Sequence, residues 1–470
     1  MGTASYHPLV TSQPSEPLAT PELVAIPPEL SGPQPVDAYI LRALAENRTV
    51  QAAFHNVESL KLRIPQVTAL DDPVASNTIF PIPSVAPQYS LMGYNPYNLT
   101  LAQQFPWCGT LRVRGQVAAR DVDVALAEMA AAQLDAVLAV KRAYFDLYAN
   151  QKTELILAES RKILELFRER AGQQLGSGGT QSDLLRAGVL ISELDRELAN
   201  NQAGIATARA ALARQIHVSP DADLRALPDA PLANVPAQIE RLYQLAIAAR
   251  PELKGRLSAI ARDEQAVELA RKRSYHNLTL GLTYMDMEKT NAQTPRTAGG
   301  FPNVGLFVGF NLPINRAKYR ASIGEAEERT RADAKLYEAQ RDETYSEIYD
   351  FMVQARVQQN VLTLLRDSIL PRAEQTLELA GKDFALSNVN LPTVLSAQRE
   401  TLQVQVQIAQ IEGELGKALA SLERAVGCQF NDHPPTTPPV ADPLPPPPAT
   451  TSPFDTSAPG ADQAQRPDRP

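Results

Sequence analysis

Apolar residues recur at helical spacing over an unbroken stretch at residues 116–171, which contains neither glycine nor proline. This spacing predicts one helix, about 80 Å long at 1.5 Å per residue. A second stretch at residues 314–370 shows the same pattern, is interrupted at Gly324 and ends near Pro371. The pattern then resumes at residues 372–386. The sequence therefore predicts two very long helices of matching reach.

Each long helix is followed by a turn of small residues and then by a returning helix. The turns lie at residues 176–180 and 387–392. Glycine and asparagine accept the left-handed backbone that such turns need. Short connections make consecutive helices antiparallel neighbours. We therefore expect two long helical hairpins whose tips lie at one end of the molecule.

Strict alternation of apolar and small or polar residues predicts a strand hairpin. Residues 278–285 and 304–312 both alternate in this way, and a long polar loop at 286–302 joins them. Residues 99–105 occupy the matching place earlier in the chain, and their partner strand is expected between residues 65 and 89.

The alternation gives the strands one apolar side and one polar side, as in the strands of a membrane barrel. The residues expected to face lipid are Leu278, Leu280, Leu282, Tyr284, Leu306, Val308 and Phe310. The residues expected on the polar, lumen side are Thr279, Thr283 and Asn311. A barrel without an open edge needs about eight strands or more, so four strands must be completed by further copies of the chain.

The same order of elements occurs twice, at residues 37–216 and 239–427. Units this long are not those of a solenoid, and a two-fold pseudo-symmetric body is expected. The predicted organisation is a disordered Pro- and Ser-rich segment at 1–35, a first repeat at 36–217, a linker at 218–238, a second repeat at 239–428 and a disordered Pro-rich tail at 429–470.

Composition excludes several classes of protein. The net charge of −8 without a basic run argues against nucleic-acid binding. Cys108 and Cys428 lack the spacing of a disulfide framework or a thiolate metal site. No run approaches the ~18 apolar residues of a membrane-spanning helix, and the first residues lack the pattern of a signal peptide.

Candidate chemistry is sparse. Met285, Met287, Asp286 and His276 are close in sequence, but two thioethers and one imidazole make no closed metal site, and packing is the preferred interpretation. The five histidines are scattered, and no nucleophile and base are brought together. We therefore expect no enzymatic activity, no catalytic residue, no cofactor and no metal site.

Five segments carry a pattern that points to one family, namely 43–47, 249–253, 305–313, 369–373 and 183–187. Together they resemble the TolC-type outer-membrane efflux proteins. Residues 104–111 look like the branch of this family that works beside metal-exporting pumps. The resemblance extends over residues 37–427.

The resemblance implies a mainly α fold with β structure. In this family, duplicated antiparallel hairpins form an α-helical barrel in the periplasm, and four strands per chain form a twelve-stranded transmembrane β-barrel in a homotrimer. Such proteins are passive exit ducts in the outer membrane that are docked by their tips to a periplasmic adaptor and an inner-membrane pump. The duct is expected to be gated by relative movement of the hairpin tips.

The resemblance also implies roles for residues at the tips. The expected adaptor contacts are Gly176, Ser177, Gly178, Gly179, Thr180, Ser387, Asn388, Val389, Asn390 and Leu391. The expected aperture positions are Asp183, Arg186, Thr393 and Ser396. The family commonly has acidic residues after the second-half turn, where this chain has Thr393 and Ser396, so an acidic ring is not expected.

Two alternatives remain at this stage. In a soluble, duplicated coiled-coil scaffold, Leu278, Leu280 and Leu282 would face a protein core. A periplasmic adaptor also carries long hairpins, but it has one hairpin between β-domains, and this sequence predicts two in tandem.

Overall fold

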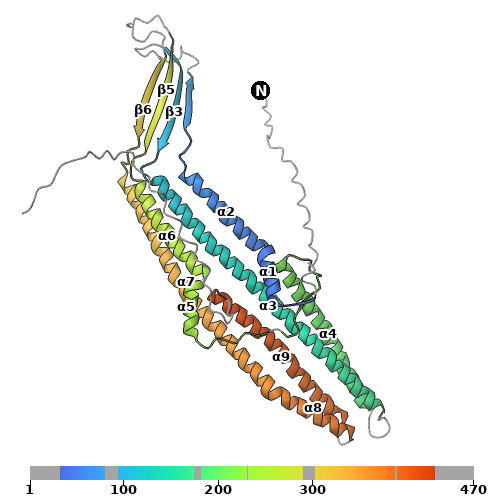
Figure 1. Cartoon of the computed structure of the whole chain (residues 1–470). Coiled ribbons are helices and arrows are strands. Elements are labelled where there is room, and N and C mark those ends of the chain that lie inside the picture. Colours follow the sequence, from blue (N-terminus) through green and yellow to red (C-terminus); the bar gives the residue numbers. More distant parts are fainter. Residues whose placement is uncertain are drawn as a thin grey trace, which may run out of the picture. The chain divides into compact units, whose positions relative to one another are not determined.

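The computed structural model describes residues 32–79, 94–173, 181–229, 231–288, 302–386 and 389–428. The predicted mixture of long helices and strands is confirmed (Figure 1). No helix among these residues is both long enough and apolar enough to span a membrane.

The first repeat contains α1 (Val36–Glu46), α2 (Arg48–Thr68), β2 (Val74–Ile79), β3 (Tyr94–Phe105), α3 (Thr110–Gln173) and α4 (Gln181–Ile216). The second repeat has the same order, with α5 (Ile239–Ala249), α6 (Pro251–Lys272), β5 (Leu278–Glu288), β6 (Asn303–Phe310), α7 (Arg316–Leu364), η2 (Leu365–Ile369), α8 (Leu370–Ala385) and α9 (Leu391–Val426). The short strands β1 (Gly32–Gln34) and β4 (Leu224–Ala226) pair in parallel.

The helices pack side by side as a wall, and the central ones have neighbours on two sides. On the side of the sheet, α2 packs on α3, α3 on α6 and α6 on α7 (Figure 1). On the side of the tips, α4 packs on α3, α3 on α9, and α9 on α7 and α8. A helix with neighbours on two sides needs apolar residues on two sides, which explains why the stripes in the sequence are not confined to one seam.

Each repeat has a core of its own, and the two cores are equivalent. In the first, Tyr39 of α1 and Leu147 of α3 pack with Leu212 of α4. In the second, Leu242 of α5 and Met352 of α7 pack with Leu422 of α9. The short helix of each repeat therefore seals the long hairpin of the same repeat, as the duplication predicts.

The sheet has the order β2-β3-β5-β6, and all its pairs are antiparallel. The two strand pairs of the repeats therefore join through β3 and β5, and β2 and β6 are the edge strands. The missing partner strand of the first repeat is β2, inside the range expected for it.

Three details of the sequence prediction are wrong. Residues 32–34 are ordered as β1, although they were expected in a disordered segment. Gly324 does not interrupt the helix, because α7 continues through it. Asn311 lies beyond the end of β6 at Phe310, so it is not a strand residue.

The second long helix contains one π-helical turn, η2. The N–H of Leu370 donates to the carbonyl of Leu365, five residues earlier. Pro371 follows directly and has no N–H to donate, so the regular helical ladder is interrupted at this point. The helix then continues as α8 instead of ending there.

Candidate functional site

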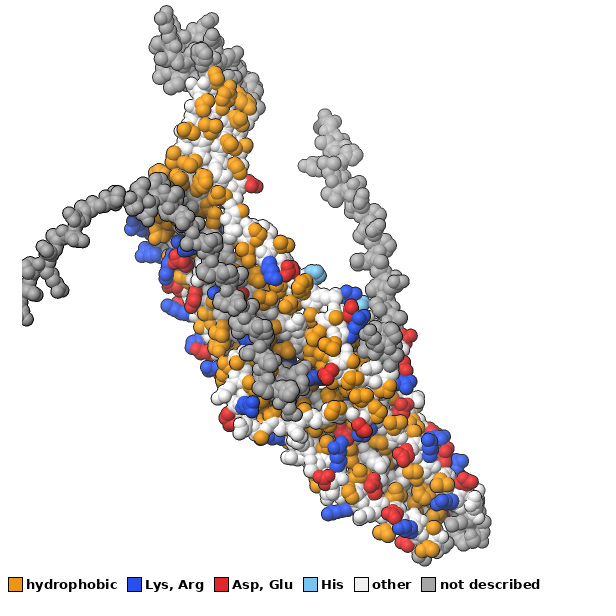
Figure 2. All heavy atoms as spheres, viewed as in Figure 1, with side chains coloured by type: hydrophobic (Ala, Val, Ile, Leu, Met, Phe, Trp, Pro, Cys, Tyr) orange, Lys and Arg blue, Asp and Glu red, His pale blue; other side chains and the backbone are white. Residues whose placement is uncertain are grey.

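One face of the sheet is apolar and exposed. The antiparallel register aligns Leu278 with Phe310, Leu280 with Val308 and Leu282 with Leu306. Leu280 and Leu282 are 42% and 46% exposed, and Leu306 reaches 86%. Apolar side chains are spread over the sheet in the space-filling view (Figure 2). All seven residues predicted to face lipid are exposed on this one face, namely Leu278, Leu280, Leu282, Tyr284, Leu306, Val308 and Phe310.

The other face carries small and polar side chains. The hydroxyls of Thr100 and Thr283 lie 3.2 Å apart across β3 and β5. Gly281 leaves room for the ring of Phe307, because a Cβ at that glycine would lie 2.0 Å from a ring carbon. Phe307 is therefore an aromatic residue on the face that the sequence predicts to be polar. Assignment of Thr279 and Thr283 to a lumen stays a prediction.

Aromatic residues mark the junction between the sheet and the helices. Trp107, which follows β3, stacks on Tyr275, which precedes β5, with ring centroids 5.1 Å apart. The backbone N–H of Trp107 donates to Oδ1 of Asn277 over 3.3 Å. Asn311 joins the same region, since its side-chain oxygen accepts from the N–H of Asn277. These contacts fasten the entry to α3 to the exit from α6.

The predicted tip contacts are only partly described. Gly176, Ser177, Gly178, Gly179, Thr180, Ser387 and Asn388 lie outside the described residues. Leu391 is only 3% exposed, and Val389 packs against the same apolar cluster. The expectation of a surface contact at Leu391 is therefore wrong for this chain, because its side chain stabilises the tip from within.

The four aperture candidates occupy the first turns of the returning helices. Asp183 and Arg186 lie in α4, and Thr393 and Ser396 lie in α9, with the same spacing of three residues. Arg186, Thr393 and Ser396 are exposed, and Asp183 is partly exposed. The hydroxyl of Ser396 donates to the carbonyl of Thr393 over 2.8 Å. Their role at an aperture stays a prediction.

Glu412 is a buried carboxylate that connects three helical elements. It lies in α9 and is 1% exposed. Tyr148 and Lys152 of α3 each donate to its Oε2 over 2.7 Å, and Arg366 of η2 donates to its Oε1. Burial raises the pKa of the Glu412 carboxyl, but the hydrogen bonds from Lys152, Tyr148 and Arg366 outweigh burial and leave it lowered. Glu412 therefore holds a negative charge among helices.

The sequence contains a signal for Glu412 that was missed. Ile408, Leu415 and Leu419 form an apolar helical face, and Glu412 lies on that face. A lone carboxylate on an apolar face requires a buried partner.

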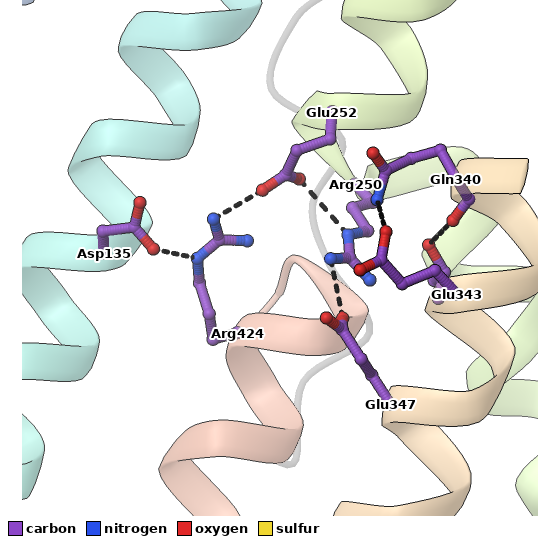
Figure 3. A network of polar contacts seen from close by, with 8 residues as sticks. Asp135, Arg250, Glu252, Gln340, Glu343, Glu347 and Arg424 are labelled. Atoms are coloured by element: carbon purple, nitrogen blue, oxygen red, sulfur yellow. Dashed lines mark hydrogen bonds and ion pairs between the residues drawn. The ribbon is translucent and has the colours of Figure 1, made fainter. Parts of the chain in front are cut away.

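A second polar network ties the repeats together near α5 and α6 (Figure 3). Arg250 is 5% exposed, and its Nη2 lies 2.7 Å from Glu347 of α7. Its Nε donates over 3.3 Å to Glu252 of α6. Glu252 also accepts from Arg424 of α9, whose Nε donates over 2.7 Å to Asp135 of α3. The network therefore joins α3, α6, α7 and α9.

Asn47 occupies the equivalent place in the first repeat. Its φ and ψ of −65° and 121° match the −62° and 121° of Arg250. Its side chain accepts from the N–H of Thr49 and donates to Oε1 of Gln215. The two repeats therefore fasten the same helix junction with different chemistry.

A groove of about 680 Å³ lies between α3, α4 and α9. It is lined by apolar residues and by polar ones that include Glu193, Asn201 and Arg399. Gln398 is 3% exposed and donates to Ser160 over 3.4 Å.

Metal-ligand chemistry is limited in the part of the chain that the structure describes. No group of three or more His, Cys, Asp or Glu residues is close enough there to hold an ion. His276 contacts the carbonyl of Asn311 at 3.1 Å. The side chains of Asp286 and Met287 lie outside the described part.

Residues 242–428 match the sequence profile of the family described as "Outer membrane efflux protein". The cobalt-zinc-cadmium resistance protein CzcC of Cupriavidus metallidurans is 23% identical in an alignment of 412 residues that covers 85% of this chain and 92% of CzcC.

Solved structures share the fold. The outer membrane protein VceC of Vibrio cholerae aligns with a TM-score of 0.67 and 18% identity, covering 84% of this chain and 97% of VceC. The CmeC outer membrane channel of Campylobacter jejuni aligns with a TM-score of 0.68 and 15% identity, covering 84% and 87% of the two chains.

The fold and the exposed apolar sheet define the class of outer-membrane channels that continue into long helical hairpins. The resemblance to outer membrane efflux proteins predicted from the sequence is confirmed by the match over residues 242–428 and by the likeness to CzcC over most of both chains.

Proposed function

We propose that this chain forms a homotrimeric outer-membrane channel with a periplasmic helical tunnel, and that the trimer is the passive exit duct of a tripartite efflux system. The observation that carries the proposal is the exposed apolar face of a four-stranded sheet whose edge strands β2 and β6 are both open. An open edge leaves unpaired N–H and C=O groups, which are costly in lipid. Pairing β6 of one copy with β2 of the next removes every edge.

The helices support the same closure. The order of the helices α2-α3-α6-α7 in the wall matches the order of the strands β2-β3-β5-β6 in the sheet. In both, the first repeat forms one edge and the second repeat forms the other. A ring of copies would therefore close the strands and the helices together. Three copies would supply about twelve strands, which lies within the range of bacterial barrels.

No chemical step is required of such a duct. Its polar face would offer hydroxyls such as those of Thr279 and Thr283 to passing solutes, and a wide polar bore suits conduction rather than tight binding. The tips near Asn390 would contact a periplasmic adaptor, and an inner-membrane pump would supply the energy. Movement of the hairpins around Asp183, Arg186, Thr393 and Ser396 would open the duct.

The name of CzcC suggests a solute class to test. We propose divalent transition-metal cations, in agreement with the likeness of residues 104–111 to the metal-exporting branch. The measurement is growth of a host lacking its own metal-efflux channel, complemented with this chain and its cognate adaptor and pump, on graded zinc, cobalt and cadmium. Equal metal sensitivity of the strains with and without this chain would exclude these cations, provided that the trimer is present in the outer membrane of the complemented strain.

The duct itself is tested by purification and reconstitution. We expect extraction only with detergent, a trimer that dissociates on heating before electrophoresis, and conductance in planar bilayers. A water-soluble monomer would refute the proposal.

The soluble scaffold is disfavoured by a specific observation. It requires Leu278, Leu280 and Leu282 to be packed in a protein core, and these side chains are 41%, 42% and 46% exposed in the chain. The adaptor alternative is disfavoured by the two hairpins, one from α3 and α4 and one from α8 and α9.

A further inference from the structure

Charges of opposite sign lie at the two edges of the sheet, where it meets the helices. Asp71 and Asp72 lie between α2 and β2. Arg316, Lys318 and Arg320 lie in the first turns of α7, which follows β6. All five residues are exposed.

These five charges are not neutralised locally. Residues 311–324 contain three basic side chains and no acidic one, and residues 64–73 contain two acidic side chains and no basic one. Within the described ranges, none of the five forms an ion pair with another residue of the same chain. Each edge therefore presents charges of one sign that have no ion-pair partner among the described residues of their own chain.

Exposed apolar side chains accompany the charges on both edges. Leu70, directly before Asp71, is 45% exposed. Leu312 and Ile314, just before Arg316, are 62% and 81% exposed. Each edge thus combines an apolar contact with a cluster of charge, which is the composition of a surface that another protein covers.

The strand directions bring these two surfaces to the same level. In the register within the chain, Leu278 pairs with both Phe105 and Phe310, and Val74 pairs with Ala102. The helix-side ends of all the strands therefore lie in one band across the sheet. Since β2 leaves this band and β6 returns to it, antiparallel pairing between copies would place the start of β2 beside the end of β6.

We propose that, in the assembled ring, Asp71 and Asp72 of one copy pair with Arg316 and Lys318 of the next copy, with Leu70 packed against Ile314. Arg320 adds to the positive field at this contact. The inference rests on the proposed function, which supplies the ring. It names the contact that joins each copy to the next. The occupant of each edge is a second copy of this chain.

A lipid surface is the competing occupant of the basic edge. Phosphate head groups would attract Arg316 and Lys318, but they would repel Asp71 and Asp72, which lie in the same band. Pairing between copies uses both clusters, and this is why the charge complementarity favours it.

The test is a charge exchange in the full chain, read as trimer on a gel without heating and by light scattering in detergent. Asp71→Lys with Asp72→Lys, and separately Arg316→Glu with Lys318→Glu, should each lose the trimer at a temperature at which the wild type keeps it. The combined four-residue exchange should restore the trimer. The matched control, Arg112→Glu with Arg273→Glu, reverses two exposed charges in the same band on the central helix α3 and at the end of α6, and it should keep the trimer.

Cross-linking gives a second measurement that does not depend on stability. With Cys108 and Cys428 replaced by serine, Asp72→Cys combined with Lys318→Cys should be joined between copies by a short bismaleimide. Asp72→Cys combined with Arg273→Cys should not be joined.

The outcomes separate the two proposals. A monomeric wild type would overturn the ring itself. A trimeric wild type that tolerates both charge reversals, or an exchange that fails to restore what the reversals lose, would overturn the contact. A different result would assign the basic edge to lipid instead. The aspartate variants would keep the trimer, and the loss of trimer in the Arg316 and Lys318 variants would depend on the anionic lipid content of the vesicles.

Discussion

Leu282 and Thr283 are neighbours in β5 that lie on opposite faces of the sheet, and they offer a direct test of which face meets lipid. Leu282→Arg places a guanidinium on the apolar face, in the middle of the strand. Arginine on the lipid face of a barrel costs about 2–4 kcal/mol near the bilayer midplane, or about 6–12 kcal/mol for three copies. Each 1.4 kcal/mol corresponds to about a tenfold change in an equilibrium constant, so the folded population in vesicles should fall strongly.

Thr283→Arg is the matched control. It places the same charge one residue away, on the face with small and polar side chains. The expected cost is about 1 kcal/mol per copy, for loss of the contact with Thr100. The difference between the variants therefore isolates the environment of the two faces.

The assay is folding into vesicles against urea, followed by tryptophan fluorescence and by trimer on unheated gels. The chain has one tryptophan, Trp107, which stacks on Tyr275 at the end of the sheet and so reports on this region alone. Equal losses for the two variants, or a larger loss for Thr283→Arg, would refute the assignment of Leu282 to lipid.

Three further predictions concern the helices. Glu412→Leu should lower the free energy of unfolding by about 3–5 kcal/mol because it leaves Lys152 without its carboxylate. The double variant Glu412→Leu with Lys152→Met should recover most of that loss, as measured by melting curves in detergent. Gly416→Ala should cost about 1–3 kcal/mol because its Cβ would lie 2.5 Å from the Phe145 ring, whereas Gly381→Ala, with no atom within 4 Å, should be neutral or slightly stabilising. Because the pKa of Glu412 is lowered in the fold, its stabilisation is complete above about pH 4.3 and is lost as the pH falls through the lowered value. Wild type should accordingly lose more melting temperature below about pH 4.3 than Glu412→Gln does, and equal losses would contradict this origin of acid sensitivity.

The sequence predicted the elements that depend on a repeated local pattern. The long helices and the pair β5 and β6 follow from periodicity, which persists over many residues and tolerates local exceptions. The apolar face of the sheet followed from the same alternation. The register between β3 and β5 did not, because these strands come from different repeats and no local turn connects them.

The features that were missed depend on tertiary contacts. The strands β1 and β4 have three residues each, which is too short for a periodic signal. Arg250 and Asn47 align in the duplication, but the partner Glu347 is far away in sequence, so its ion pair could not be predicted. The burial of Leu391 depends on the packing of both hairpins at the tip.

The π-helical turn η2 has a consequence for the history of the second repeat. A regular α-helix advances about 100° per residue, so one added residue rotates every later side chain by that angle. The π-helical turn closes its hydrogen bond over five residues instead of four and so adds one residue to the helix. The side of α8 on which Ala380 and Phe384 are buried therefore depends on that added residue. Deletion of a single residue within Leu365–Ile369 would turn those two side chains toward water. The number of residues in this turn can therefore no longer change without loss of the packing of α8.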